Sequence, residues 1–169
     1  MVPTLVLVGA ILRRYQLRLR LFTRKQIVNK RVAGFHNNRL DGATDLLLRA
    51  RDASVLDVGM NRGLVSLEFA GNGARLIHGC DAYEEGVRTA REIFSDIPEV
   101  TSQFEIVDLT KGEQALRDVF GRAYRKYDIV LFLAIDHELQ RVMEQEQINT
   151  LVGCLADRTQ RYFVYRGRT

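Results

Sequence analysis

From residue 53 onward, short apolar runs alternate with longer amphipathic segments. The runs are rich in β-branched residues, as buried strands are, and the longer segments repeat apolar residues at helical steps. We predict strands at 53–58, 75–80, 103–107, 127–133 and 161–165. We predict helices at 62–70, 83–94, 112–120 and 138–155, and a short one at 43–50 that Asp41 caps. The long helix at 138–155 should bury Leu139, Val142, Met143, Leu151 and Leu155.

Strands that alternate with helices predict an α/β fold with a doubly wound, Rossmann-like and mostly parallel sheet. Right-handed crossovers and a reversal after the third strand give the strand order 3-2-1-4-5. Ligands of such sheets bind at the carboxyl ends of the strands, where the order reverses. A length of 169 residues and an apolar content of 46% suit one domain, which we place at residues 41–169.

The first forty residues differ in charge from the rest of the chain. Residues 1–40 contain nine Lys or Arg and no Asp or Glu, whereas the remainder has sixteen basic and twenty-one acidic residues. Apolar residues recur at helical steps from Leu5 to Phe22, which predicts a basic helical arm. The arm either covers the sheet or pairs with a second subunit, lies on a membrane surface through residues 1–31, or contacts RNA. The mildly acidic body carries no strong nucleic-acid signal.

The cysteines and histidines restrict the chemistry and the compartment. Cys80 and Cys154 lie far apart and form neither a C-x-x-C nor a metal-ligand pattern. Three scattered histidines give no zinc pattern either, so we expect no metal. Unpaired cysteines are typical of a reducing compartment, which predicts a cytoplasmic protein, peripheral at a membrane if the arm binds one.

The most informative segment is V-L-D-V-G-M-N-R-G at residues 55–63, a strand that passes through a tight turn into a helix. Gly59 and Gly63 should let the backbone approach a ligand closely. The N–H groups at the start of the helix should then offer it hydrogen-bond donors. Asn61 replaces the second glycine of G-x-G-x-x-G, which disfavours a nicotinamide oxidoreductase.

This turn and three later segments resemble, in order, the motifs of class I S-adenosylmethionine-dependent methyltransferases. D-x-G-x-x-x-G at residues 57–63 is similar to motif I, and L-I-H-G-C-D-A-Y places the acidic Asp81 at the end of the second strand. F-E-I-V-D-L-T and Y-D-I-V-L-F-L-A are similar to the third and fourth strand motifs, and the resemblance spans about residues 53–166.

The resemblance implies S-adenosyl-L-methionine as the cofactor. It places Asp81 on the ribose and Asp108 and Leu109 beside the adenine, while Tyr83 either flanks the adenine or packs within its own helix. The implied cofactor-binding residues are Asp57, Gly59, Asn61, Gly63, Asp81, Ala82, Asp108, Leu109 and Ala134.

Methyl transfer requires the acceptor's nucleophilic atom to be positioned in line near the methyl carbon. A general base is required only if the acceptor must lose a proton. The family places such groups after the fourth strand, so His137 is our candidate catalytic base or acceptor-orienting residue. In the competing interpretation Asp136 caps the next helix and His137 lies in its solvated first turn. The segment lacks the N/D-P-P-Y sequence of nucleic-acid amino methyltransferases, so we expect a small-molecule acceptor rather than DNA.

Complete family members continue after the fifth strand with a helix and an antiparallel hairpin, whereas this sequence stops at Thr169. We therefore expect a domain truncated after strand five, without the hairpin. Two functions stay open at this point. One is methyl transfer to an unidentified acceptor, and the other is a noncatalytic cofactor-binding or scaffold module with the same fold.

Overall fold

A computed structural model describes residue 40 and residues 43–133 and 135–166. The strands are β1 (Ser54–Val58), β2 (Leu76–Asp81), β3 (Thr101–Ile106), β4 (Tyr127–Leu133) and β5 (Thr159–Arg166). The α-helices are α2 (Leu64–Gly71), α3 (Glu84–Ser95), α4 (Glu113–Phe120), α5 (Asp136–Leu139) and α6 (Gln145–Asp157). Short 3-10 helices are η2 (Thr44–Arg49), η3 (Leu109–Lys111) and η4 (Gly121–Ala123). The predicted arm (apart from Leu40), Asp41 and Ala134 lie outside the described residues.

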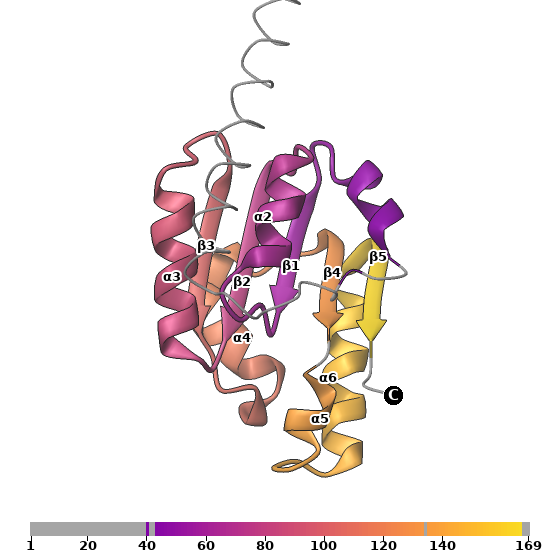
Figure 1. The fold of residues 1–169 in the computed structure, drawn as a ribbon. Coiled ribbons are helices and arrows are strands. Elements are labelled where there is room, and N and C mark those ends of the chain that lie inside the picture. The colour runs from indigo at the N-terminus through magenta and orange to yellow at the C-terminus, as the bar shows by residue number, and fades with distance from the viewer. Residues whose placement is uncertain (1–39, 41–42, 134, 167–169) are drawn as a thin grey trace, which may run out of the picture. The chain divides into compact units, whose positions relative to one another are not determined.

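The five strands form one sheet in the order β3-β2-β1-β4-β5, and every neighbouring pair is parallel, which confirms the predicted fold class. Helices α2 and α3 cover one face of the sheet, and α4 and α6 cover the other (Figure 1). Since β1 lies between β2 and β4, the carboxyl ends of these three strands share one edge of the sheet. This edge contains the point at which the strand order reverses.

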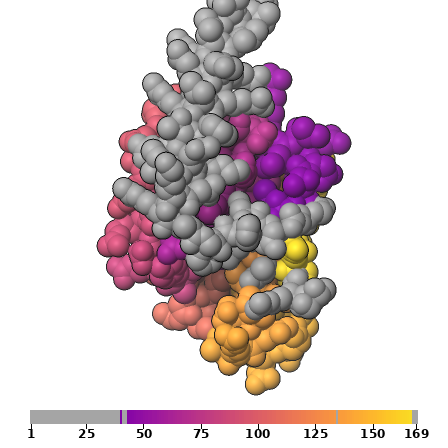
Figure 2. Space-filling view, in the orientation of Figure 1, coloured from indigo at the N-terminus to yellow at the C-terminus, as the bar shows by residue number. Residues whose placement is uncertain are grey.

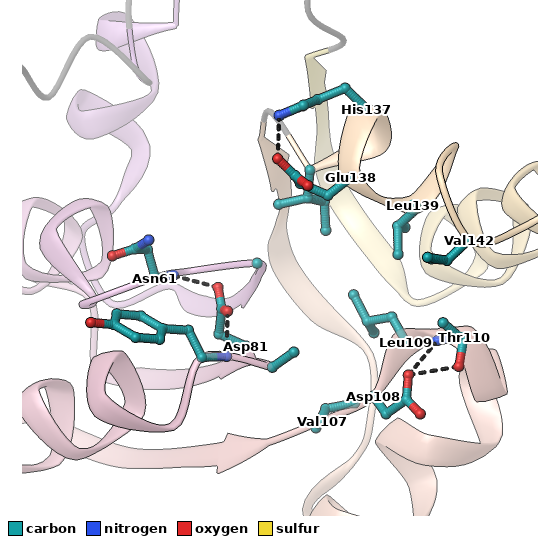
Figure 3. A pocket seen from close by; sticks show the side chains of 14 residues that line it. Asn61, Asp81, Val107, Asp108, Leu109, Thr110, His137, Glu138, Leu139 and Val142 are labelled. Carbon is teal, nitrogen blue, oxygen red and sulfur yellow. Dashed lines mark hydrogen bonds and ion pairs between the residues drawn. The ribbon is translucent and has the colours of Figure 1, made fainter.

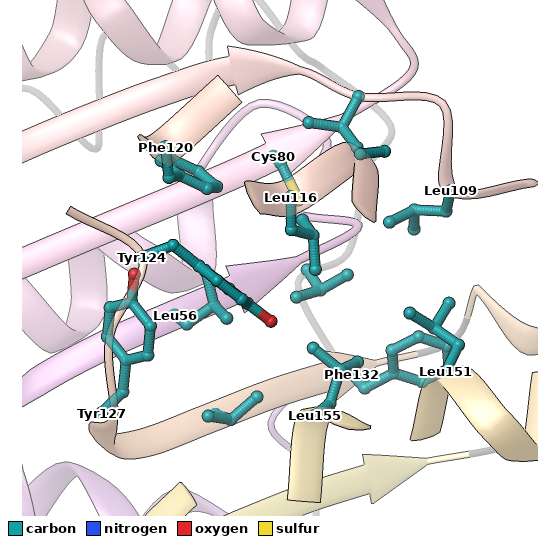
Figure 4. Packing of buried hydrophobic residues seen from close by; sticks show 14 of the residues in the cluster. Leu56, Cys80, Leu109, Leu116, Phe120, Tyr124, Tyr127, Phe132, Leu151 and Leu155 are labelled. Carbon is teal, nitrogen blue, oxygen red and sulfur yellow. The ribbon is translucent and has the colours of Figure 1, made fainter. Parts of the chain in front are cut away.

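A large apolar cluster fills the space between the sheet and helices α4 and α6 (Figure 4). Leu56, Phe132 and Leu155 are completely buried in it, and Tyr127 closes its end at the start of β4. One polar side chain, His78 of β2, is buried beside this cluster. Its Nδ1 lies 2.7 Å from the Tyr127 hydroxyl, and its ring stacks on Phe120 with centroids 5.1 Å apart. Hydrogen bonding and stacking together allow this imidazole to be buried.

The long helix predicted at 138–155 is wrong, because the chain forms two helices there. Helix α5 ends at Leu139, and α6 begins only at Gln145. The Glu144 and Gln147 side chains form a capping box at the start of α6, which stabilises a new helix start at this point. The break turns Val142 outward, so it is 67% exposed instead of buried, whereas Leu139, Met143, Leu151 and Leu155 are buried as predicted.

The surface exposes few large apolar side chains within the described residues. The two most exposed are Leu48 of η2, at 83%, and Val142 before α6, at 67%. Figure 2 shows η2 (indigo) and the α5–α6 region (orange) at the surface. Among the described helices, none combines the length and the apolar composition needed to cross a bilayer.

Candidate cofactor site

A cavity of about 580 Å³ lies at the carboxyl ends of β1, β2 and β4, where the strand order predicts a ligand site (Figure 3). Its volume falls within the roughly 300–1,000 Å³ range of small-molecule sites. The lining residues come from the turns after four strands: Gly59, Asn61, Asp81, Ala82, Tyr83, Val107, Asp108, Leu109, Thr110, Ile135, His137, Glu138, Leu139 and Val142.

Most of the predicted site residues meet at this cavity. The lining includes Gly59, Asn61, Asp81, Ala82, Asp108, Leu109 and His137. Asp57 and Gly63 are not in the lining, and Ala134 lies outside the described residues. The structure thus brings together residues of four separate segments, and their individual roles stay predictions.

The glycines of the motif I turn let two other segments pack closely against it. Gly59 has φ +76°, and a Cβ added to it would collide with the side chain of Ile135, after β4. Gly63 has φ +71°, and its Cβ would lie 3.0 Å from the Cβ of Ala90 on α3. The glycines therefore allow close packing of the turn against the residue that follows β4 and against α3, and their contact with a ligand stays a prediction.

The backbone donors of this turn are also used within the protein. The Gly59 and Met60 N–H groups both donate to the Cys80 carbonyl, at 2.9 and 3.1 Å. The Asn61 N–H donates to Asp81 Oδ2 at 2.7 Å, and the Gly63 N–H donates to the Met60 carbonyl at 3.1 Å. These bonds fix the turn, and ligand contacts of the N–H groups at the start of α2 stay a prediction.

Asp57, the first residue of motif I, acts from inside the protein. It is 2% exposed, and Ser66 Oγ of α2 donates to its Oδ2 at 2.7 Å. This bond joins β1 to the helix that follows the turn. Asp57 therefore positions the turn from the interior of the protein and is not among the residues that line the cavity.

The Asp81 carboxylate joins the turn to the start of α3. Its Oδ2 accepts from the Asn61 N–H at 2.7 Å, and its Oδ1 accepts from the Tyr83 N–H at 2.9 Å. Each carboxylate oxygen has two acceptor positions, so one position per oxygen remains for a ligand hydroxyl. Asp81 can therefore hold the turn and accept a ribose hydroxyl at the same time.

Tyr83 forms an aromatic wall of the cavity. The Arg62 guanidinium lies over its ring at 5.3 Å from the centroid and donates to its hydroxyl at 3.1 Å. The hydroxyl in turn donates to Glu85 Oε2 at 2.7 Å, and this bond raises the pKa of Tyr83 above its usual value. The ring is fixed by these contacts, and it lines the cavity.

The opposite wall carries a second carboxylate. Thr110 donates to Asp108 Oδ1 through its hydroxyl, at 2.7 Å, and through its backbone N–H, at 3.1 Å. These hydrogen bonds lower the pKa of Asp108, so the side chain is ionised at neutral pH. Leu109, which is 7% exposed, follows it at the start of η3.

His137 lies on the wall that α5 provides, with 25% of its side chain exposed. Its Nε2 is 3.0 Å from Glu138 Oε1, and Glu138 Oε2 is 2.9 Å from an Arg141 guanidinium nitrogen. The capping interpretation of Asp136 is wrong, because the N-cap of α5 is Ile135 and no side chain caps it. Asp136 is instead 6% exposed and accepts a long, 3.4 Å hydrogen bond from the Tyr165 hydroxyl.

Seven lining residues were absent from the predicted set of site residues: Tyr83, Val107, Thr110, Ile135, Glu138, Leu139 and Val142. Tyr83, Val107, Thr110 and Ile135 lie next to or within two residues of a predicted residue, so taking the whole segment after each strand would have found them. Glu138 and Leu139 belong to α5 and Val142 follows it, so the loops after the strands do not include these three. Within the described residues, no group of three or more His, Cys, Asp or Glu side chains is arranged to hold a metal ion.

Solved structures similar to this chain include WbdD, a bifunctional kinase-methyltransferase. WbdD with the kinase inhibitor LY294002 has 28% sequence identity and a TM-score of 0.60, and the match covers 77% of this chain and 30% of that chain. Monomeric WbdD gives 27% identity and a TM-score of 0.60, with 79% and 32% covered. TehB from Haemophilus influenzae has 14% identity and a TM-score of 0.55, with 81% and 42% covered, and shows the fold alone.

No family model and no curated protein sequence matches the chain. The chain spans about a third of the length of the WbdD chains that it matches. The sheet order and these neighbours agree with each other. The chain therefore has the fold of a class I S-adenosylmethionine-dependent methyltransferase core.

Proposed function

We propose that the cavity binds S-adenosyl-L-methionine and that the protein transfers its methyl group to a small-molecule acceptor. One observation carries this proposal. Residues of four segments, each matched to a methyltransferase motif in the sequence, converge on one cavity at the reversal of strand order. The likeness to WbdD supports the same class of reaction.

The residues of the cavity fit the chemistry of this cofactor. Asp81 retains acceptor positions for the ribose hydroxyls, and Asp108 with Leu109 offers a polar and an apolar contact for the adenine. Tyr83, whose ring is held by Arg62, lines the wall of the cavity opposite Asp108 and Leu109. The three carboxylates in the lining, of Asp81, Asp108 and Glu138, favour a positively charged ligand. When bound, the sulfonium supplies an electrophilic methyl group and leaves as a neutral thioether.

His137 is the residue of the cavity that can take a proton from an acceptor. It lies on α5, directly after β4, and its imidazole contacts the Glu138 carboxylate. A histidine in such a position is suited to general-base catalysis. If the cavity binds the cofactor without turnover, the protein is instead a noncatalytic cofactor-binding module.

Calorimetric titration tests the proposal. S-adenosylhomocysteine and S-adenosylmethionine should bind with one-site stoichiometry, and NAD should not bind. Asp81→Ala should weaken binding, because charge-assisted hydrogen bonds to the ribose contribute about 1.5–3 kcal/mol each. Asp118→Ala, on the exposed surface of α4, is the matched control and should bind normally.

A second assay separates the enzyme from the noncatalytic module. Tritiated methyl groups from the cofactor should be transferred to a small-molecule fraction of a cell extract. His137→Gln should reduce this transfer by about 10²–10⁴ and leave the affinity for S-adenosylhomocysteine unchanged. Binding without any transfer would favour the noncatalytic module, and no binding would refute both.

A further inference from the structure

The end of the sheet opposite the cavity is basic. The segments that lead from η2 into β1, from α2 into β2, from α4 into β4 and from α6 into β5 contain six Lys or Arg and one Asp, Asp52. The segment before β3 has Asp96 and Glu99 and no basic residue, so the positive charge is limited to the rest of this end. The six basic residues are Arg51, Arg75, Arg122, Arg125, Lys126 and Arg158.

Hydrogen bonds join these segments into one surface. Arg75 Nε donates to the carbonyl oxygen of Asp52 at 2.8 Å, which connects the segments before β2 and β1. The Tyr127 N–H donates to the carbonyl oxygen of Arg158 at 2.8 Å, which connects the starts of β4 and β5. Figure 1 shows this end at the tails of the strand arrows, whereas the cavity lies at the carboxyl ends, where the arrows point.

Asp128, near the start of β4, connects the two halves of this surface. Ser54 Oγ at the start of β1 donates to its Oδ2 at 2.8 Å. Burial raises the pKa of Asp128, but the hydrogen bonds from Ser54 and the charges of Arg161 and Arg75 together lower it. Cations from β5 and from the segment before β2 therefore both lie near this carboxylate.

The segment before β4 has the largest positive charge without a partner. Arg122, Arg125 and Lys126 are all exposed, and none of them forms an ion pair with a carboxylate of the described residues. Arg158, by contrast, is paired with Glu113 at 2.9 Å. Three exposed cations so close together attract an anionic partner.

The apolar and aromatic residues of this end favour a lipid surface over a nucleic acid. Leu48 of η2 is 83% exposed, and Arg49 and Arg51 follow it closely in the chain. An exposed apolar side chain beside cations suits the interface of an anionic bilayer. Single-stranded nucleic acids bind by stacking on exposed rings, whereas Tyr124 and Tyr127 are 8% and 0% exposed.

We propose that this end of the sheet docks on an anionic lipid bilayer. Arg122, Arg125 and Lys126 bind the lipid headgroups, and Leu48 inserts between them. The cavity then opens away from the bilayer and stays accessible to a water-soluble ligand. The surface contains none of the residues that line the cavity, so lipid binding does not depend on the cofactor.

Co-sedimentation of the full chain with vesicles tests the inference. The vesicles contain phosphatidylcholine alone or an equal mixture of phosphatidylcholine and anionic phosphatidylglycerol. The protein should bind only the anionic vesicles, and it should dissociate at about 1 M salt, where charges are screened beyond about 3 Å.

A triple variant locates the binding surface. Arg122→Gln, Arg125→Gln and Lys126→Gln combined should weaken binding to the anionic vesicles by about a hundredfold, because each basic residue near such a surface contributes about fivefold. All three side chains are exposed, so their replacement should leave the fold intact, which far-UV circular dichroism checks.

A second triple variant is the matched control. Arg88→Gln, Lys111→Gln and Arg141→Gln combined remove the same net charge from exposed positions on α3, on η3 and after α5. This variant should bind the vesicles as the unaltered protein does. Both triple variants keep residues 1–40, so the comparison between them cancels any contribution of the predicted basic arm.

Replacement of an apolar residue tests the insertion separately. Leu48→Ser should weaken binding by about tenfold, because burial of a leucine side chain in lipid is favourable. Ile106→Ser makes a similar change at the opposite end of the sheet, where Ile106 is 45% exposed, and should leave vesicle binding unchanged.

Four results would overturn the inference. The first two are equal binding to neutral and anionic vesicles, and no binding to either kind. The third is equal weakening by the two triple variants, which would assign the binding to overall charge or to residues 1–40. The fourth is tighter binding of a labelled RNA that the Arg122, Arg125 and Lys126 variant abolishes, which would assign the surface to a nucleic acid. The comparison of the two vesicle compositions needs no variant.

Discussion

Replacing Gly59 with alanine tests why motif I needs a glycine in this protein. An alanine at φ +76° costs about 1–2 kcal/mol of backbone energy. The new Cβ would also press on the Ile135 side chain, whose Cδ1 and Cβ would lie 2.8 and 3.2 Å away. Overpacking of this kind costs about 1–3 kcal/mol. Gly59→Ala should therefore destabilise the fold by roughly 2–5 kcal/mol.

A double-mutant cycle with Ile135→Ala separates these two contributions. Ile135→Ala removes the atoms that the new Cβ would strike first, so the double variant should recover the overpacking part, about 1–3 kcal/mol. The backbone part should remain. Gly153→Ala on α6 is the control, because its Cβ would meet nothing within 4 Å, and it should stabilise the protein by about 0.5–1 kcal/mol.

Urea unfolding followed by far-UV circular dichroism measures these energies, and the chain has no tryptophan for a fluorescence assay. A coupling energy between Gly59→Ala and Ile135→Ala within about 0.5 kcal/mol of zero would refute the packing explanation. In that case the positive φ of Gly59, and not its contact with Ile135, would account for the loss of stability.

Three further variants test separate parts of the structure by the same unfolding assay. Asp81→Ala loses the bonds from the Asn61 and Tyr83 N–H groups and should cost about 2–4 kcal/mol; a cost near zero would contradict its role in holding the turn. Glu144→Ala removes the capping box of α6 and should cost about 0.5–2 kcal/mol; no loss would mean that packing alone fixes the helix start. Burial, with a smaller effect from the Arg125 charge, lowers the pKa of His78 from 6.5 to about 4, so the fold favours its neutral form. Stability should therefore fall between about pH 6.5 and 4, by at most roughly 3 kcal/mol, because the unfolded chain binds the proton first. His78→Phe should remove this part of the pH dependence, and an unchanged slope would assign it to other groups.

The strands were predictable because each is a short β-branched run between turn formers. Strand β4 has the bounds that the sequence predicted, Tyr127–Leu133, and the other strands differ by a few residues at their ends. The handedness of βαβ connections then allows few strand orders, and the observed one was expected. The position of the cavity followed from that order, since it depends on which carboxyl ends are adjacent.

The break between α5 and α6 was not predicted from periodicity. Leu139 and Met143 are spaced as in one continuous helix, and both are buried, although α5 ends at Leu139 and Met143 lies within the break. The capping box of Glu144 and Gln147 was the local signal, and it competes with that spacing. The bounds of a helix therefore have to be predicted from the spacing of its apolar residues and from capping-box residues together.

The contacts inside the site depend on residues that are distant in sequence. The side chain of Ile135, which leaves no space for a Cβ at residue 59, follows β4 and not β1. The two N–H groups that donate to Asp81 come from two different turns. A single sequence identifies residues that approach the site but cannot show which of them bond to each other. The internal hydrogen bonds of the turn's amides could not be read from the sequence for this reason.

The measurement that tests the central claim most directly is the response of backbone amide signals, in nitrogen-15 NMR spectra, to S-adenosylhomocysteine. The ligand should shift the amides of residues that line the cavity, such as Asn61, Ala82 and Leu109. Ser54 and Asp128 are hydrogen-bonded to each other at the amino-terminal ends of β1 and β4, away from the cavity. Their amide signals should not shift. Saturable shifts confined to the cavity would support a methyltransferase cofactor site. No shifts at millimolar ligand, or shifts gathered around Ser54 and Asp128, would contradict it.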